Sequence, residues 1–495
     1  MTFSALTDRL REAGLLRETY GRFDDLRIDH LAGDSRRVRP NGLFVAVRGT
    51  EADGHLFIDK AVQNGAKAIV CEAVPDDREH RFPGTAFVHV SDSRSALAEL
   101  AAAYYGDPSR RMKLIGVTGT NGKTTVTHLI YHVLTDLDEA AGLMGTSGVR
   151  IGEETLDTRL TTPDALDVQR HLSAMLEEGR GTCVMEVSSH ALDQERVRAI
   201  DFDVAVFTNF TRDHLDYHGS EAAYLAAKKR LFDDLDEGAE ALYNLDDPAG
   251  TRIVADTRAR RRSYAVDTPA DIRADIVENR MDGLTLRWGG RTRRFRLVGR
   301  FNAYNLLAAA GAVTALGYPE EDVLESLEAA PPVPGRFELI AFADGTRVVV
   351  DYAHTPDALE NVLQTIVDIK DDDARLWCVF GCGGERDRSK RPLMAAVAER
   401  FADRIILTTD NPRREDPDQI LADIQEGLSD PARARVIADR RRAIEEVAQA
   451  ARSGDVVLVA GRGHEAYQIF ETEKKPFDDR QVVREAFTSR NILPP

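Results

Sequence analysis

The sequence predicts an α/β protein of three domains, and three observations lead to that prediction. The chain has 495 residues, and a domain usually has about 100–200 residues, so three domains are expected. Short apolar segments alternate with segments of helical periodicity through the middle and last parts of the chain, as in parallel-sheet proteins. A segment rich in proline, 331–338 (PPVPGRFE), interrupts this alternation and predicts a boundary, because proline suits neither helix interiors nor central strands.

The expected domains are residues 1–106, 107–335 and 336–495. In the first, buried strands are predicted at 42–49 (GLFVAVRG) and 66–72 (AKAIVCE), and a helix at 95–106 closes a small α/β unit.

In the middle domain, apolar runs at 113–118, 183–187 and 204–209 are typical of buried parallel strands. A helix is predicted after the first run, because apolar residues recur there at helical spacing: Val126, Leu129, Ile130, Val133 and Leu134.

The last domain has a Rossmann-like pattern. Four strands end in polar or glycine-rich loops, at 346–354, 375–384, 404–412 and 455–463, and helices such as 391–402 lie between them. Open α/β sheets bind their ligands at such strand ends, so a site is expected there.

Composition narrows the function classes. Apolar residues make up 43% and charged residues 30% of the chain, and the formal charge is 65 − 83 = −18, which argues against binding to nucleic acid or a membrane surface. The chain has no signal-peptide core and no run of about 18 apolar residues, so a cytoplasmic location is expected. The cysteines Cys71, Cys183, Cys378 and Cys382 are expected to be buried thiols, because no second pair or histidine cluster completes a zinc site.

Residues 113–125 (KLIGVTGTNGKTT) predict a nucleotide-binding loop between a strand and a helix. The spacing differs from the usual pattern, because Val117 stands five residues before Gly122. Glycines let the backbone approach phosphate oxygens, Lys123 supplies a positive charge, and the Thr124 hydroxyl is a ligand for Mg²⁺. Glu186 ends the strand at 183–187 and is a candidate carboxylate for the same ion; a solvated charge is the alternative. His214 follows another strand and is either functional or structural.

Nine motifs together resemble the ATP-dependent Mur ligases, and the resemblance covers essentially the whole chain. They are 116–125, 161–169, 185–197, 207–220, 299–309, 351–359, 381–394, 410–413 and 461–465. The shifted glycines Gly116, Gly119 and Gly122 are then a family variant of the nucleotide loop.

The motifs are most similar to the family member that adds diaminopimelate. The resemblance implies that ATP phosphorylates the γ-carboxylate of D-Glu in UDP-N-acetylmuramoyl-L-Ala-D-Glu. An amine of meso-diaminopimelate then attacks the acyl phosphate, phosphate is released, and an amide bond forms. ATP and Mg²⁺ are the implied cofactors. Closure of the domains would exclude water from the acyl phosphate. The protein is expected to be a monomer.

The resemblance also implies residue roles. The ATP contacts would be Gly119, Thr120, Asn121, Gly122, Lys123, Thr124, Thr125, Asn302, Asn305, Arg336 and Asp351. The metal site would use Thr124, Glu186, His214 and a carbamylated Lys228, and the catalytic groups would be Lys123, Lys228, His214 and Glu186. Carbamylation turns an ammonium into an anion, and Lys228 rather than its neighbour Lys229 matches the family's modified lysine.

For the UDP-linked dipeptide, the resemblance implies Ser35, Thr161, Thr162, Ser188, Gln194 and Arg196, with a further contact at Thr50, Glu51 and Ala52. Leu160 departs from the family pattern, which has asparagine before the threonine pair. The diaminopimelate contacts would be Arg386, Asp410, Asn411, Pro412, Arg413, Gly461 and Glu465. Diaminopimelate has a second carboxylate that lysine lacks, and a guanidinium can bind that group with two hydrogen bonds.

Four alternatives stay open. A lysine-adding ligase would lack the arginine of the 410–413 motif (DNPR), and a folylpolyglutamate-type synthetase would lack the N-terminal UDP-sugar domain. A nucleotide-dependent binding protein would make no amide bond, although three strand ends in the last domain face a substrate. No feature of the sequence supports a cell-wall scaffold.

Overall fold

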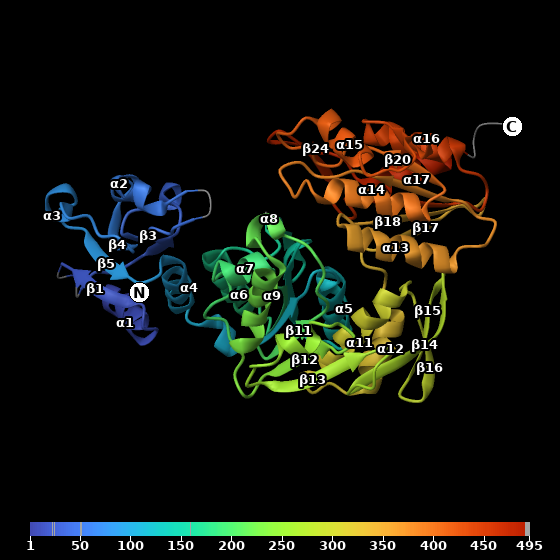
Figure 1. Cartoon of the computed structure of the whole chain (residues 1–495). Helices are drawn as coiled ribbons and strands as arrows, with labels where there is room; N and C mark the ends of the chain where they lie inside the picture. Colours follow the sequence, from blue (N-terminus) through green and yellow to red (C-terminus); the bar gives the residue numbers. More distant parts are fainter. Residues whose placement is uncertain (22, 24, 50–51, 159, 491–495) are drawn as a thin grey trace.

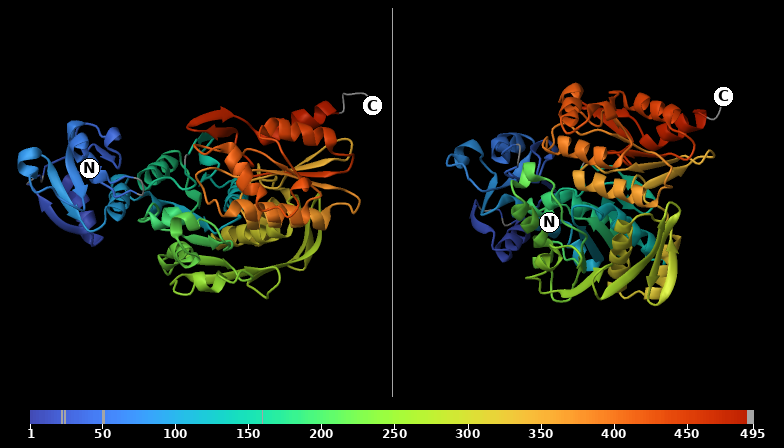
Figure 2. Two further views of the ribbon diagram at one scale, coloured as in Figure 1. Left: turned by 45° about the horizontal axis from the view of Figure 1, so that its top comes forward. Right: turned by 45° about the vertical axis from the view of Figure 1, so that its right-hand side comes forward.

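The computed structural model describes residues 1–21, 23, 25–49, 52–158 and 160–490, and it contains three main β-sheets (Figure 1). Each main sheet lies within one of the three expected residue ranges; the division at 106/107 and 335/336 itself stays a prediction. We call the parts built around these sheets the N-terminal, central and C-terminal units. The C-terminal unit lies over the central unit, and the N-terminal unit lies to one side (Figure 2).

The N-terminal unit is a five-stranded sheet in the order β1-β5-β4-β3-β2, with β1 antiparallel to the others. Its elements are α1 (Phe3–Glu12), β1 (Leu16–Tyr20), β2 (His30–Ala32), β3 (Gly42–Val45), α2 (Ile58–Gln63), β4 (Ala66–Cys71), α3 (Arg78–Arg81), β5 (Ala86–Val90) and α4 (Ser93–Tyr104). Helices α1 and α4 cover one face of the sheet and α2 packs on the other, so both faces are buried. Helix α4 also packs against α6 of the central unit, which connects the two units.

The central unit has an eleven-stranded sheet in the order β16-β15-β14-β13-β12-β11-β6-β10-β7-β8-β9. Its strands are β6 (Lys113–Thr118), β7 (Ala141–Gly145), β8 (Gly148–Ile151), β9 (Glu154–Leu156), β10 (Thr182–Glu186), β11 (Val204–Phe207), β12 (Glu240–Asn244), β13 (Arg260–Ala265), β14 (Ile272–Arg280), β15 (Gly283–Trp288) and β16 (Arg291–Phe295). Its helices are α5 (Lys123–Asp136), α6 (Ala165–Glu177), α7 (Ser189–Asp193), α8 (Leu215–His218), α9 (Glu221–Asp233), α10 (Gly250–Ile253), α11 (Arg300–Ala315) and α12 (Glu320–Ala329). Strand β6 pairs in parallel with β10 and β11, so the segments that follow these three strands lie together at one edge.

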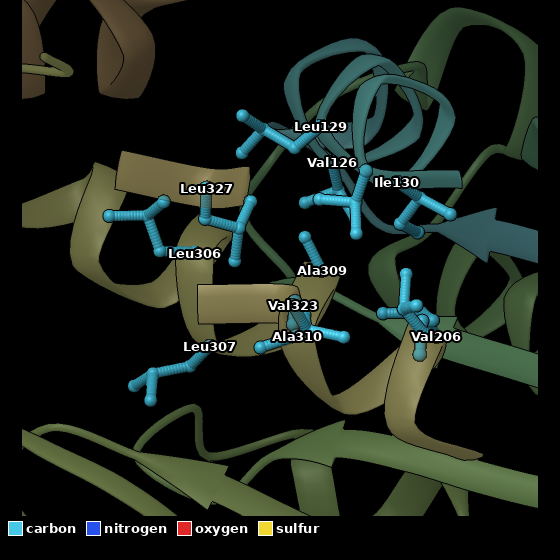
Figure 3. Packing of buried hydrophobic residues seen from close by; sticks show 14 of the residues in the cluster. Val126, Leu129, Ile130, Val206, Leu306, Leu307, Ala309, Ala310, Val323 and Leu327 are labelled. Atoms are coloured by element: carbon cyan, nitrogen blue, oxygen red, sulfur yellow. The ribbon is translucent and has the colours of Figure 1, made fainter. Parts of the chain in front are cut away.

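The predicted apolar stripe of α5 is buried, as expected. Val126, Leu129 and Ile130 pack against α11 and α12, whose contacting residues include Leu306, Ala309 and Leu327 (Figure 3). Burying such a side chain stabilises the fold by about 1.5–3 kcal/mol. This packing fixes the start of α5, and therefore the loop before it, against the sheet.

The C-terminal unit is a six-stranded sheet in the order β17-β18-β22-β19-β20-β21, parallel except for β17. Its strands are β17 (Glu338–Ala341), β18 (Arg347–Asp351), β19 (Leu376–Phe380), β20 (Arg404–Leu407), β21 (Ala434–Val436) and β22 (Val456–Ala460), with a separate hairpin of β23 (Tyr467–Phe470) and β24 (Glu473–Pro476). Helices α13 (Pro356–Ile369), α14 (Lys390–Phe401) and α15 (Pro417–Gln425) cover one face, and α16 (Arg440–Ala450) and α17 (Asp479–Arg490) cover the other. The sheet is thus covered on both faces, as the Rossmann-like pattern predicts.

All four cysteines are buried and free, which confirms the expectation for them. Among the described residues, no group of three or more metal-binding side chains of the histidine, cysteine, aspartate and glutamate types is assembled. Within the same residues, no helix combines the length and the apolar character needed to cross a bilayer.

Candidate active site

A cavity of about 570 Å³ lies between the central and C-terminal units. Most of the residues singled out from the sequence line it, from both units. From the central unit these are Thr120, Asn121, Gly122, Lys123, Thr124, Thr125, Thr161, Glu186, Ser188, Arg196, His214, Lys228, Asn302 and Asn305; Arg336, Asp351, Arg386, Asp410, Asn411, Arg413, Gly461 and Glu465 complete the set.

The nucleotide loop joins β6 to α5 and depends on two glycines with positive φ. Gly119 has a φ of +149° and Gly122 a φ of +86°, and both lie close to neighbouring side chains. A Cβ at Gly119 would overlap the Thr208 hydroxyl, and a Cβ at Gly122 would lie 2.7 Å from Asn305 Oδ1. Only glycine fits this backbone without strain, and the loop ends at the N-terminus of a long helix, which favours anions.

Two lysines donate to carbonyls of this loop. Lys123 Nζ donates to Gly119 O at 2.8 Å and Thr120 O at 2.9 Å, and Lys228 Nζ donates to Gly119 O at 2.8 Å. Lys228 lies on α9 and is only 1% exposed. Burial holds the pKa of Lys228 well below the usual value, and the charge of Lys123 lowers it further. A buried amine in this state is the kind that is found neutral and nucleophilic.

The adjacent Lys229 has different surroundings. Its ammonium forms ion pairs with Asp233 and, at 2.7 Å, with Asp256, and the cavity lining includes Lys228 but not Lys229. The geometry therefore favours Lys228 as the lysine that faces the cleft.

Thr124 and Glu186 meet beside the loop. Thr124 Oγ1 donates to Glu186 Oε2 at 3.0 Å, and the other carboxylate oxygen accepts from Thr146 N at 2.8 Å. Arg336 Nη2 donates to Thr124 Oγ1 at 2.9 Å, from the segment that leads into the C-terminal unit. Magnesium prefers a small number of protein oxygens, with water and phosphate completing its shell. The hydroxyl and the carboxylate at this point fit that ion.

Aromatic side chains surround His214, which precedes α8 with a φ of +52°. Its Nε2 lies 3.4 Å from Asp213 Oδ2, and its ring packs edge-on against His190 at 4.8 Å between centroids. Burial lowers the pKa of His214 to about 3, although Asp213 opposes that change. The imidazole is therefore neutral near pH 7 and its nitrogen lone pair is available.

The asparagines and the aspartate expected on the nucleotide side are buried and connected. Asn305 Nδ2 donates to Asn302 Oδ1 at 2.8 Å, and Asn302 Nδ2 donates to Val298 O at 2.7 Å. Asp351 ends β18 and accepts from two backbone amides, Phe337 N at 2.6 Å and Ala353 N at 2.7 Å. Burial raises the pKa of Asp351 despite these donors.

Arg386 and Arg413 line the C-terminal side of the cavity together. Arg413 Nη1 donates to Gly384 O at 2.7 Å, and burial together with the charge of Arg386 lowers the pKa of Arg413. Beside them, Asn411 Nδ2 donates to Glu465 Oε2 at 2.9 Å. Burial and the nearby Asp410 raise the pKa of Glu465. One end of this subsite thus presents two cations and the other presents carboxylates.

The residues expected to bind the UDP-linked dipeptide are only partly assembled. Arg196 Nη1 donates to Thr162 O at 3.0 Å, and its Nε and Nη2 donate to Gln194 Oε1. Five of the residues singled out from the sequence do not line the cavity: Gly119, Thr162, Gln194, Pro412 and Ser35. Ser35 lies in the N-terminal unit, where it begins a 3-10 turn that Asp34 caps. Thr50 and Glu51 lie outside the described residues. Leu160 is exposed at the cavity mouth, where it offers no polar side-chain group.

Sequence reasoning missed several residues in the cleft, and three of them make contacts that hold the site together. Asp357, in the first turn of α13, accepts from Asn121 Nδ2 at 2.9 Å and Thr211 Oγ1 at 3.2 Å, so it joins the nucleotide loop to the C-terminal unit. Tyr352 stacks under Arg336, with 4.3 Å from Cζ to the ring centroid. Thr146 follows β7 and binds Glu186. Asp357 and Tyr352 fall within the 351–359 motif, and Thr146 follows a strand parallel to β10, so position in the fold was the available signal.

A glycine-rich phosphate loop, with a second α/β unit lying over it across a polar cleft, defines a multidomain nucleotide-binding enzyme. Three family models match the chain: "Mur ligase family, catalytic domain" at 27–105, "Mur ligase middle domain" at 117–313 and "Mur ligase, glutamate ligase domain" at 335–463. The chain belongs to the Mur ligase family.

Two similar proteins have the same name. A UDP-N-acetylmuramoyl-L-alanyl-D-glutamate–2,6-diaminopimelate ligase from Parabacteroides distasonis is 46% identical over 469 residues, covering 94% of this chain and 96% of the relative. A solved structure of a ligase of that name has a TM-score of 0.68 and 34% identity, covering 96% of this chain and 98% of its own. The folylpolyglutamate synthase of Mycobacterium tuberculosis, solved with ADP and AMPPCP, shares the fold (TM-score 0.59, 19% identity) over 74% of this chain and 92% of its own.

Proposed function

We propose that the protein is an ATP-dependent ligase that joins meso-2,6-diaminopimelate to the D-Glu γ-carboxylate of UDP-N-acetylmuramoyl-L-alanyl-D-glutamate. One observation carries the proposal: a single cleft holds a phosphate-binding loop and, across from it, the paired cations Arg386 and Arg413. Two relatives named for this activity, each matching more than nine-tenths of the chain, support it.

The nucleotide loop and its neighbours would bind ATP and transfer its γ-phosphoryl group to the substrate carboxylate. The loop amides and Lys123 would neutralise the phosphates, and four further lining residues would contact the nucleoside: Asn302, Asn305, Arg336 and Asp351. Thr124 and Glu186 would hold Mg²⁺, with His214 at a second position. When bound there, the ion would supply positive charge to neutralise the phosphate groups.

Lys228 would act as a carbamate. A neutral buried amine adds to carbon dioxide and loses a proton to water, and the carbamate that forms is an anion beside the loop, which an unmodified lysine could not supply. The hydrogen bond to Gly119 O places Lys228 at the loop.

The amino-acid subsite would select diaminopimelate by its second carboxylate. Arg386 and Arg413 would bind that group, and Asp410, Asn411 and Glu465 with the Gly461 carbonyl would receive the ammonium. Lysine has no second carboxylate to offer the two guanidinium groups, so they would stay unpaired in its complex. Ser35, Thr161, Thr162, Ser188, Gln194 and Arg196 would bind the UDP-linked dipeptide.

The proposed function is tested by phosphate release from ATP and Mg²⁺ in the presence of UDP-N-acetylmuramoyl-L-Ala-D-Glu. Release should require meso-diaminopimelate and should not occur when the UDP-linked dipeptide is omitted. Release with L-lysine in place of diaminopimelate would keep the ligase chemistry and overturn the subsite assignment. If neither amino acid supports phosphate release, the protein would be a nucleotide-binding protein of another kind.

A further inference from the structure

Two loops that bear the paired cations are joined by one carboxylate, that of Glu415. Its Oε2 accepts from Arg391 Nη2 at 3.0 Å and forms an ion pair with Arg388 Nη2 at 2.9 Å, and its Oε1 accepts from the backbone amide of Glu385. Glu415 lies in the loop after β20, two residues beyond Arg413 in the sequence. Glu385 directly precedes Arg386. The carboxylate therefore holds the loop of Arg386 against the loop of Arg413.

Arg391 binds Glu415 and connects it to Asp423 on α15. The side chain is fully buried, and its Nη1 donates to Asp423 Oδ2 at 2.7 Å while Nη2 also contacts Gly383 O at 3.3 Å. A buried guanidinium needs paired carboxylates to be tolerated. Glu415 and Asp423 supply them, so Arg391 is a rigid anchor rather than a substrate contact.

The two loops need an anchor for three reasons. Arg386 and Arg413 carry like charges that oppose their approach, and the charge of Arg386 adds to the effect of burial in lowering the pKa of Arg413. Glu385 and Arg413 have φ values of +54° and +52°, a backbone region that costs non-glycine residues free energy. In the part of the chain that the structure describes, no hydrogen bond or ion pair holds the Arg386 side chain, so the loop backbone alone sets its position.

The loop interface also leaves no room for adjustment. Gly384 N donates to Asn411 O at 2.9 Å, and Arg413 Nη1 donates back to Gly384 O. A Cβ at Gly384 would overlap the Pro412 carbonyl oxygen. These contacts hold the two loops together on one side of the interface, and Glu415 closes the same interface on its far side.

We propose that Glu415, anchored by Arg391, is a positioning residue that sets the distance between Arg386 and Arg413 and thereby the selection of an amino acid with a distal carboxylate. This inference rests on the proposed function. Glu415 does not line the cavity and acts only through the two loops.

The test is Glu415→Gln, which keeps the shape and one acceptor but removes the charge. We expect its KM for meso-diaminopimelate to rise by about 10- to 100-fold, as for other small misplacements of binding groups. The KM values for ATP and for the UDP-linked dipeptide should stay at the wild-type level. The ratio of kcat/KM for diaminopimelate to that for L-lysine should fall, because only diaminopimelate uses the paired cations.

A matched control is Asp455→Asn in the same unit. Asp455 is 3% exposed and accepts from Arg375 Nη2 at 2.7 Å, Arg452 N at 2.8 Å and Trp377 Nε1 at 3.1 Å. It lies at the opposite end of β19 and β22 from the cavity. The Asp455→Asn variant should have a lower thermal midpoint of unfolding. Its KM for diaminopimelate and its ratio of kcat/KM for diaminopimelate to that for L-lysine should not change.

Wild-type enzyme is measured first, and no turnover with diaminopimelate would refute the proposed function itself. With an active wild type, an unchanged KM for diaminopimelate in Glu415→Gln would overturn the positioning role. An equal rise in all three KM values, or a Glu415→Gln protein that does not fold, would also overturn it, because Glu415 would then serve only stability.

Discussion

Adjacent lysines on α9 differ in ways that their sequence could not reveal. Lys228 is buried beside the nucleotide loop, whereas Lys229 is paired with carboxylates outside the cavity. Because a helix turns about 100° per residue, one position decides whether an amine faces the cleft. Resemblance suggested Lys228, and the fold supplies the physical reason.

Replacing Lys228 by alanine should lower kcat by about 10- to 100-fold, the usual loss when a group supporting a metal is removed. Turnover should recover in part when a small carboxylate such as formate is added, because it can stand in for the carbamate. Steady-state phosphate release measures both effects. Lys229→Ala is the control and should cost about 1 kcal/mol or less of stability, because it breaks exposed ion pairs; full activity in Lys228→Ala would contradict the assignment.

At Arg413, truncation to alanine should remove a partner of the second substrate carboxylate. The loss in kcat/KM for diaminopimelate should correspond to about 2–5 kcal/mol, the range for a buried charge pair left incomplete. The KM for ATP should change little, because the phosphate loop lies across the cleft. Steady-state kinetics with each substrate varied checks both, and exposed Arg414→Ala is the neighbouring control. If Arg413→Ala kept the wild-type kcat/KM for diaminopimelate, Arg413 would not be the residue that selects this substrate.

At the scale of elements, buried parallel strands and their loops were the most predictable parts. The apolar runs at 113–118 and 204–209 contain β6 and β11. The glycines Gly119 and Gly122 in the loop after β6 have positive φ, as a glycine-rich phosphate loop predicts. Predicted strands ran too long where they included the loop, as at 42–49 against β3. Apolar periodicity marks the buried part of a strand, but it does not say where the ladder of hydrogen bonds ends.

The antiparallel strands β14, β15 and β16 were not predicted. Their segments are rich in arginine and expose one face, as at Arg287 and Arg294, so they do not resemble the apolar runs of a buried parallel strand. They are stabilised by cross-strand pairing and by packing on α11 and α12 instead.

The nucleotide loop is the element whose glycines are easiest to test. Gly119→Ala should weaken ATP binding strongly and destabilise the protein by about 1–3 kcal/mol, because its Cβ would overlap the Thr208 hydroxyl at a positive φ. Isothermal titration with an ATP analogue and thermal unfolding measure the two effects. Gly238→Ala is the control, since a Cβ there meets nothing within 4 Å. Unchanged ATP affinity in Gly119→Ala would contradict the loop's role.

At the scale of the whole molecule, the cleft depends on contacts between residues far apart in sequence. Asn121 and Asp357 are 236 residues apart yet hydrogen-bonded, and Arg336 reaches Thr124 from the other unit. Motifs predicted which residues belong to a site, and most of them line one cavity. No local pattern could predict that Asp357 joins the loop to α13, because that contact exists only once the two units meet.

The arrangement of the units places the phosphate loop and the paired cations on opposite walls of one cavity. Phosphoryl transfer and amino-acid selection can therefore occur without release of an acyl phosphate to water. The central claim is that this cavity selects diaminopimelate over lysine.

That claim is tested most directly by a competition measured by mass spectrometry. The enzyme is given ATP, Mg²⁺, UDP-N-acetylmuramoyl-L-Ala-D-Glu and equal concentrations of meso-diaminopimelate and L-lysine, and the two possible tripeptide products are quantified. The account predicts a product that contains diaminopimelate almost alone. A lysine product in comparable or greater amount would contradict it.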